Sequence, residues 1–169
     1  VKPLKIGHAG TLDPFATGVL VVLLGEATKL SRWLTAHDKE YLATLQFGVE
    51  TDTLDREGEV VRTTEVPGHL LTSERLQPEF EGFLGKREQV VPVYSAVRVD
   101  GKRLMKEARA GRHVTPPSRC VECYSLEIVD INSALAQATI RMHCSKGYYV
   151  RSFARDLGRC LGVGAHLRE

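Results

Sequence analysis

The sequence predicts one mixed α/β (α+β) domain with a largely antiparallel sheet flanked by helices. Two β-rich runs, 120–131 and 134–143, are separated only by an Asn-Ser pair, which is the pattern of a β-hairpin. Residues 41–47 alternate apolar and polar side chains, as a half-buried strand does. The segment from about Tyr149 to Leu161 places its apolar residues on one helical face and ends at a glycine. These three patterns together favour strands in sequence, with helices packed on them.

The N-terminal part of the chain predicts two further elements. The run from Gly18 to Gly25 is continuously apolar and rich in β-branched residues, which is typical of a strand buried on both faces. We therefore expect it in the middle of the sheet. Residues 26–36 carry apolar side chains at helical spacing and predict a short amphipathic helix.

Two more elements are expected in the middle of the chain. Residues 59–62 form a short β-rich run, and we expect it to pair with the strand at 41–47 across the turn-forming TDTLDREG segment. A helix is expected to begin at a cap formed by Thr72 or Ser73 and to run through Leu84.

Composition limits the classes of protein. A chain of 169 residues with 43% hydrophobic and 26% charged residues is typical of one globular domain, here residues 1–169. The longest apolar run, Val19 to Leu24, is far shorter than the roughly 20 residues that cross a bilayer. We expect a soluble, cytoplasmic protein with four reduced cysteines and no membrane partner.

The sequence lacks the motifs of common cofactor and metal sites. It contains no phosphate-binding P-loop and no glycine fingerprint for dinucleotides, so no cofactor is expected. Cys120 and Cys123 could suggest zinc. Residues three apart in a strand point to opposite faces, however, and no second pair follows at zinc-ribbon spacing, so no metal is expected.

Positive charge is concentrated in one stretch although the net charge is only +2. Residues 98–119 carry seven bases against two acids, and residues 102–111 have helical spacing with a glycine cap at the end. Lys102, Lys106 and Arg109 fall on one face of that helix. Such a face attracts a polyanion, and the alternative is an ordinary solvated surface.

One loop has an unusual set of residues around a carboxylate. Three glycines and Pro14 surround Asp13 just before the apolar run. Proline disfavours the helical region for the residue before it, and glycines allow close approach of another molecule. We therefore expect Asp13 in an extended conformation at the end of the sheet. The alternative is an Asp-Pro turn in which the side chain bonds its own backbone.

The loop reads GHAGTLDPFATG, and it resembles the catalytic motif G-H-x-G-x-L-D-P-x-A-T-G of the TruB family of tRNA pseudouridine synthases. The resemblance covers almost the whole chain in order. It continues through LGEATK (24–29), KEY (39–41), TDTLDREG (51–58), PVYSA (92–96), GKRL (101–104) and CSKGYYVR (144–151). It implies the pseudouridine synthase catalytic fold. From the resemblance we expect this chain to lack the family's N-terminal strand and C-terminal RNA-binding domain.

Carried over by position, the resemblance implies a set of roles. Asp13 becomes the nucleophile or base, and Arg151 the partner that keeps it ionised and oriented. Tyr41 becomes the residue that stacks on the target uracil, and His8 helps to extrude the nucleotide. The ordinary alternatives are a core tyrosine and a solvated histidine. Two further positions match residues that line the family's pocket, Lys29 and Tyr149.

The resemblance also places an RNA-clasping insertion at about 92–119, after the P-x-x-S-A motif. It implies contact of the insertion's bases with tRNA: Arg98, Lys102, Arg103, Lys106, Arg109 and Arg112. The expected substrate is the T-arm stem-loop of tRNA, modified by a monomer without a guide RNA. Two other functions stay open from the residues alone, a tRNA-binding folding factor with secondary or lost catalysis, and a small-molecule acid/base hydrolase.

Overall fold

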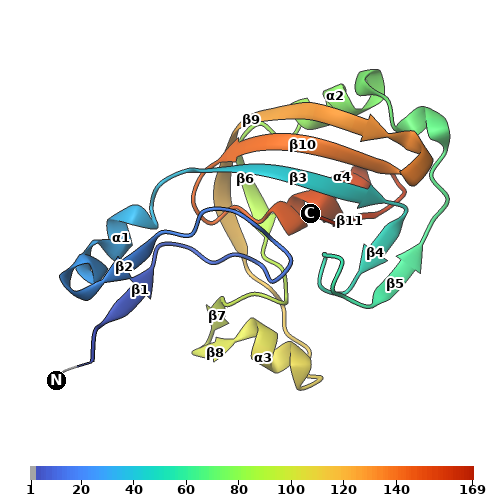
Figure 1. Ribbon diagram of the computed structural model, residues 1–169. Coiled ribbons are helices and arrows are strands. Elements are labelled where there is room, and N and C mark those ends of the chain that lie inside the picture. The colour runs from blue at the N-terminus through green and yellow to red at the C-terminus, as the bar shows by residue number, and fades with distance from the viewer. Residues whose placement is uncertain (1–2) are drawn as a thin grey trace.

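The computed structural model describes residues 3–169 and contains one five-stranded sheet in which all neighbouring strands are antiparallel (Figure 1). The strand order is β11-β3-β10-β9-β6. The strands are β11 (Ala165–Leu167), β3 (Lys39–Phe47), β10 (Gln137–Cys144), β9 (Ser118–Asn132) and β6 (Gly85–Val90). The mixed fold with a largely antiparallel sheet is therefore confirmed.

The predicted hairpin is β9 and β10. A short 3-10 turn, η3 (Ser133–Leu135), joins them, and the Asn132 side chain caps it by accepting a hydrogen bond from the Leu135 amide at 3.1 Å. Ala136 then adopts a left-handed conformation with φ 51°. The small polar residues that marked the turn in the sequence thus form it.

The main core lies between the sheet and two helices, α2 (Ser73–Glu81) and α4 (Val150–Cys160). Phe153 of α4 meets the ring of Phe83 edge-on with centroids 4.9 Å apart, and alternate residues of β3 face the same core. Thr72 caps α2 by accepting from the Arg75 amide, as predicted. The helix ends at Glu81 rather than Leu84, because the Phe83 and Leu84 amides bond carbonyls three residues back instead of four.

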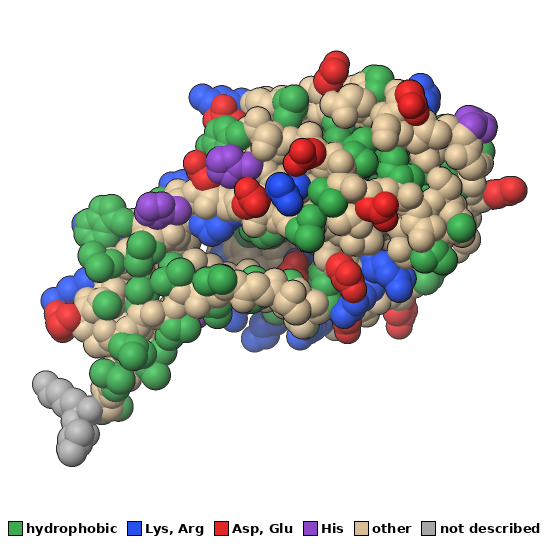
Figure 2. Space-filling model, turned by 45° about the horizontal axis from the view of Figure 1, so that its top comes forward, with side chains coloured by type: hydrophobic (Ala, Val, Ile, Leu, Met, Phe, Trp, Pro, Cys, Tyr) green, Lys and Arg blue, Asp and Glu red, His purple; other side chains and the backbone are tan. Residues whose placement is uncertain are grey.

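The predicted position of the apolar run 18–25 is wrong. Only β2 (Val22–Leu24) is a strand, and it pairs with β1 (Ile6–His8) in a two-stranded ribbon outside the main sheet (Figure 1). Val19 is 92% exposed, and apolar side chains cover the projecting arm in Figure 2. An apolar run predicts burial only where another layer covers it, and within residues 3–169 most side chains of this run lie uncovered. The predicted helix at 26–36 is split into η1 (Gly25–Leu30) and α1 (Ser31–Leu34).

The strand expected at 59–62 is β5 (Val60–Thr63), but its partner differs from the prediction. It pairs with β4 (Val49–Thr51) instead of β3. Gly48 separates β3 from β4 with φ 82°, where a Cβ would lie 2.6 Å from Val66 Cγ2. The tight turn at this glycine redirects the chain, so the hairpin forms beside the sheet.

The insertion, at about 92–119, lies below the sheet in Figure 1. It contains β7 (Arg98–Val99), β8 (Lys102–Arg103) and α3 (Leu104–Arg109), and its own small core is built on Val91, Val97 and Leu104. The helix is shorter than predicted, because Lys102 belongs to β8. A further 3-10 turn, η2 (Gly68–Leu70), precedes α2. Across residues 3–169, no helix combines the length and the apolar character that crossing a membrane would take.

Candidate active site

Asp13 lies in a turn that its neighbours enforce. Its carbonyl accepts a hydrogen bond from the Ala16 amide at 2.9 Å, which closes a four-residue turn with Pro14 at the position that favours proline. The side chain does not bond this backbone; it pairs with Arg151 instead. The Asp13 side chain is 36% exposed, so a substrate can reach it.

Arg151 is the second residue of α4, and its side chain is only 7% exposed. Nη2 donates to Oδ1 of Asp13 at 3.1 Å, and Nε lies 2.9 Å from Oδ2. The guanidinium thus faces both oxygens of the carboxylate and fixes its orientation. The pairing expected between Asp13 and Arg151 is present, although the catalytic role of either residue stays a prediction.

A second carboxylate shares the same guanidinium. Oδ2 of Asp55 lies 3.3 Å from Nη1 of Arg151, and the Asp55 side chain is 7% exposed. Nη1 also donates to the Thr53 carbonyl at 3.0 Å. Asp55 is held in turn by the Thr53 hydroxyl at 2.6 Å and the Glu57 amide at 3.0 Å. Asp55 lies in the TDTLDREG segment, to which the sequence gives no catalytic or binding role. Its contact with Arg151 indicates that it helps to position the guanidinium.

Tyr41 lies near Asp13, and Tyr149 precedes the helix that carries Arg151. Tyr41 is half-buried on β3, and burial raises its pKa, with smaller contributions from Cys144 and from the negative charge of Asp13. Its hydroxyl therefore stays protonated at neutral pH. Tyr149 precedes α4, and the buried Gln89 side chain binds its amide at 2.8 Å and its carbonyl at 3.1 Å. Gln89 thereby fixes the start of the helix that carries Arg151.

His8 and Lys29 lie on the N-terminal arm. The His8 ring is exposed and contacts the Gly10 carbonyl, while Lys29 pairs with Glu26 on the surface of η1. Among residues 3–169, no hydrogen bond or ion pair joins either side chain to Asp13. Figure 2 shows the molecule hollowed between this arm and the main body. Their roles stay predictions.

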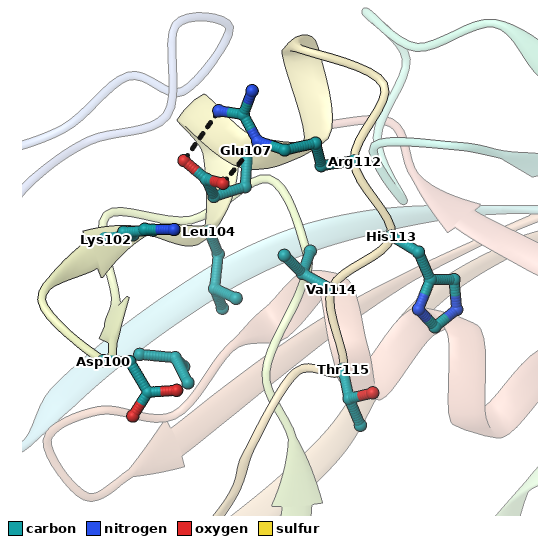
Figure 3. Close-up of a pocket in the computed structure, with 9 residues that line it drawn as sticks. Asp100, Lys102, Leu104, Glu107, Arg112, His113, Val114 and Thr115 are labelled. Carbon is teal, nitrogen blue, oxygen red and sulfur yellow. Dashed lines mark hydrogen bonds and ion pairs between the residues drawn. The ribbon is translucent and has the colours of Figure 1, made fainter.

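The predicted basic residues of the insertion are exposed, but they are not equivalent. Arg112 forms a two-point pair with the buried Glu107, Nε to Oε2 at 2.6 Å and Nη2 to Oε1 at 2.9 Å (Figure 3). Hydrogen bonding to Arg112 lowers the pKa of Glu107. Arg98 donates to the Gly101 carbonyl at 3.4 Å. Two exposed side chains of α3, Lys106 and Arg109, have no such partner within the described part of the chain.

Arg155, one turn after Arg151 on α4, is a buried basic residue. It is 8% exposed, donates to the Val90 carbonyl at 3.3 Å and pairs with Asp156 at 2.8 Å. It is a structural residue that fastens α4 to the end of β6.

Two cavities border the insertion. One of about 440 Å³ has an apolar floor and the Glu107–Arg112 pair in its wall (Figure 3). The second, of about 480 Å³, lies between the insertion and the β4–β5 turn, where Asp52 and Tyr94 line it. The side chain of Asp13 is 36% exposed and lines neither cavity. Among residues 3–169, no group of three or more His, Cys, Asp or Glu could hold a metal ion.

A reachable carboxylate that a buried arginine orients, beside a half-buried tyrosine at the end of a sheet, defines a candidate site for nucleophilic or acid/base catalysis. Comparison with known proteins specifies it further. Residues 1–150 match the model of the TruB family pseudouridylate synthase (N terminal domain), and the chain belongs to this family.

The relatives carry one name. The chain is 46% identical over 163 residues to the tRNA pseudouridine synthase B of Opitutus terrae, covering 96% of this chain and 66% of that protein. It is 44% identical over 164 residues to the protein of the same name from Francisella tularensis, covering 96% of this chain and 53% of the relative. The chain thus spans about half to two thirds of the length of these relatives.

Solved structures agree on the fold. The chain resembles a chain in the crystal structure of a Cbf5-Nop10-Gar1 complex, with a TM-score of 0.66 and 29% identity over 97% of this chain and 39% of that one. It resembles a chain in an H/ACA RNP bound to a substrate RNA containing 2'-deoxyuridine, with a TM-score of 0.62 and 26% identity over 97% of this chain and 37% of that one. The predicted catalytic fold is therefore confirmed.

Proposed function

We propose that this chain is the catalytic domain of a tRNA pseudouridine synthase and that Asp13 is its catalytic carboxylate. The observation that supports this proposal is the set of contacts around Arg151. Its guanidinium faces both oxygens of Asp13. Nη1 of the same guanidinium contacts Asp55 and the Thr53 carbonyl. The substrate is a uridine in the T-arm loop, reached without a guide RNA by a monomer in the cytoplasm. Sequence identity of 44 to 46% to proteins named tRNA pseudouridine synthase B supports this choice.

The chemistry suits these groups. Isomerisation breaks the bond between C1′ and N1, turns the uracil, and forms a bond between C1′ and C5, while the proton leaves C5 and N1 gains one. No net oxidation occurs, so side chains suffice. Attack by Asp13 and proton removal by Asp13 both require the same oriented, solvent-reachable carboxylate. Arg151 supplies that orientation.

The uridine must leave its stack before Asp13 can reach it, at a cost of a few kcal/mol. Tyr41 offers a half-buried aromatic ring close enough to Asp13 to feel its charge. Stacking on such a ring contributes about 1 to 3 kcal/mol per base, which offsets much of that cost. His8 and Lys29 on the N-terminal arm, and Tyr149 at the start of α4, contact the RNA beside this uridine.

The insertion at about 92–119 supplies the grip on the RNA backbone. Two exposed basic side chains of α3, Lys106 and Arg109, are available to phosphates. Lys102 and Arg103 extend the positive surface along β8. Arg98 and Arg112, which have partners within the insertion, contribute less of their charge to the RNA.

The test is to incubate the purified protein with unmodified tRNA and map pseudouridine, comparing wild type, Asp13→Asn and a matched control, Asp130→Asn, on the exposed part of β9. We expect wild type and control to form product, and Asp13→Asn to bind tRNA but lose at least about 10²-fold in rate. Equal product from wild type and Asp13→Asn would assign catalysis to another group. tRNA refolding by both, with no product from either, would identify a folding factor instead.

A further inference from the structure

The helix α4 begins with few of the features that stabilise a helix start, although its second residue is Arg151. Tyr149, which precedes the helix, makes no side-chain cap hydrogen bond, and the first turn contains no acidic residue. The preferred caps are Ser, Thr, Asp and Asn, and the positive end of the helix dipole disfavours a cation such as Arg151. The first turn of α4 therefore depends on contacts from outside the helix.

Strand β6 supplies such a contact through a glutamine that is only 2% exposed, Gln89. Its Oε1 accepts from the Tyr149 amide at 2.8 Å, and its Nε2 donates to the Tyr149 carbonyl at 3.1 Å. A side-chain amide can accept and donate at once, whereas an ionised carboxylate can only accept. One side chain thus fixes both main-chain polar groups of the residue that precedes α4.

The next residue of β6 holds the same turn of the helix. The Val90 carbonyl accepts from the hydroxyl of Ser152, a fully buried residue, at 2.8 Å. It also accepts from Nη2 of Arg155 at 3.3 Å. Arg151 lies between Tyr149, which Gln89 holds, and Ser152, so its main chain has a fixed position.

A fixed main chain matters for Arg151 because the guanidinium lies at the far end of a long side chain. The guanidinium contacts the carboxylates of Asp13 and Asp55 and the carbonyls of Thr53 and Tyr94, the carbonyls at 3.0 and 3.2 Å. These contacts hold only the head of the side chain. Gln89 holds the other end, from which the side chain starts.

We propose that Gln89 is a positioning residue for the isomerisation: its side-chain amide fixes the main chain at the start of α4, and this sets the position from which Arg151 reaches Asp13. The effect of Gln89 on the reaction passes through Arg151. The inference rests on the proposed function, because it assigns a role within the same reaction.

The experiment separates rate from binding and tests the dependence on Arg151. Gln89→Met keeps a side chain of similar length and removes both hydrogen bonds. Gln46→Met on β3 is the matched control, because Nε2 of Gln46 likewise donates to a main-chain carbonyl, that of Leu135 at 2.9 Å, in the turn between β9 and β10. Single-turnover rates with saturating protein, Kd for unmodified tRNA and melting temperatures are measured for these variants, for Arg151→Lys, and for the double variant that combines Gln89→Met with Arg151→Lys.

We expect Gln89→Met to lower the rate about 10-fold or more with Kd changed less than about threefold, and Gln46→Met to keep the wild-type rate. If Gln89 acts through Arg151, the two substitutions are not additive. Adding Gln89→Met to Arg151→Lys should then lower the rate by less than about threefold more.

A merely structural role predicts another pattern. A lower melting temperature with an unchanged rate for folded Gln89→Met, or a loss seen only in Kd, overturns the inference while leaving Asp13 as the catalytic group. The same rate loss with and without Arg151→Lys overturns it as well. If Gln89→Met loses its cooperative melting transition, Gln89→Asn, which keeps the amide on a shorter side chain, takes its place and must lower the rate at constant Kd. Absence of product from wild type would instead reject the proposed function.

Discussion

Asp55 and Asp13 sit on the two sides of one guanidinium, with Oδ2 of Asp55 3.3 Å from Nη1 of Arg151 and Oδ2 of Asp13 2.9 Å from Nε. The buried aspartate and the reachable aspartate thus compete for the same positive charge. Because the two side chains differ in burial, they have different roles. Asp13 is accessible to a substrate, whereas Asp55 can only position Arg151.

Asp55→Asn should therefore impair the reaction without touching the substrate. The amide keeps the shape of the carboxylate but weakens its hold on Nη1, so that Arg151 shifts toward Asp13. A misplacement of about 1 Å costs up to about 10²-fold in rate. Single-turnover pseudouridine formation measures this loss, with Asp130→Asn as the control for an exposed aspartate. A rate equal to wild type, in a protein of unchanged melting temperature, would contradict the positioning role.

The insertion makes a quantitative prediction about salt. Removing Lys106 and Arg109 together should lower the slope of log Kd against log salt concentration by about 0.7 for each single-strand phosphate that the two side chains neutralise. Arg75→Ala on α2 is the control, because α2 and α3 lie at opposite ends of the molecule in Figure 1. Binding titrations of unmodified tRNA over a range of salt concentrations measure the slopes. Equal slopes for the double variant and wild type would show that α3 does not grip phosphates.

Gly158 should tolerate no side chain. A Cβ there would lie 2.3 Å from the Ala165 amide nitrogen and 2.4 Å from the Gly164 carbonyl carbon, both backbone atoms that cannot turn aside. Gly158→Ala gains up to about 1 kcal/mol in helix propensity. Overpacking costs about 1 to 3 kcal/mol or more. We expect net destabilisation.

Gly68→Ala serves as the matched control for that substitution, since nothing lies within 4 Å of its Cβ position and its φ is not positive. Thermal or urea unfolding of the two variants gives the comparison. A melting temperature for Gly158→Ala at or above that of Gly68→Ala would mean that β11 does not pack on α4 as closely as described.

The cysteines should separate by reactivity. Burial raises the pKa of the Cys144 thiol to about 12, and the neighbouring Cys123 adds to the effect. At pH 8 only about one Cys144 in 10⁴ is a thiolate, because the protonated form dominates at every pH below the pKa. Cys120 and Cys160 are exposed. In the folded protein we expect a disulfide reagent to modify Cys120 and Cys160 rapidly, and Cys144 to react faster as the pH rises. After denaturation we expect the reagent to modify all four cysteines.

Mass spectrometry after brief labelling identifies which thiols have reacted. Rapid modification of native Cys144 at pH 8 would contradict its burial between β3 and β9, in the strand that precedes α4.

The local elements could be predicted from the sequence because their signals are local. The β9–β10 hairpin follows from two β-rich runs around Asn132, the start of α2 from the side chain of Thr72, and α4 from the spacing of Phe153 and Leu157. The family likewise follows from a linear string of residues around Asp13. Propensity, capping and motif each need only a few neighbouring residues.

Only the tertiary structure decided which distant residues meet. Asp13 and Arg151 are 138 positions apart, and Arg151 and Tyr94 are 57 apart, so no spacing along the chain predicts their contacts. The exposure of Val19 was unpredictable for the same reason, because burial depends on what packs over a segment as well as on its own apolar side chains. The spacing of apolar residues predicts which face of a helix or strand is apolar. The rest of the chain determines which element, if any, packs on that face.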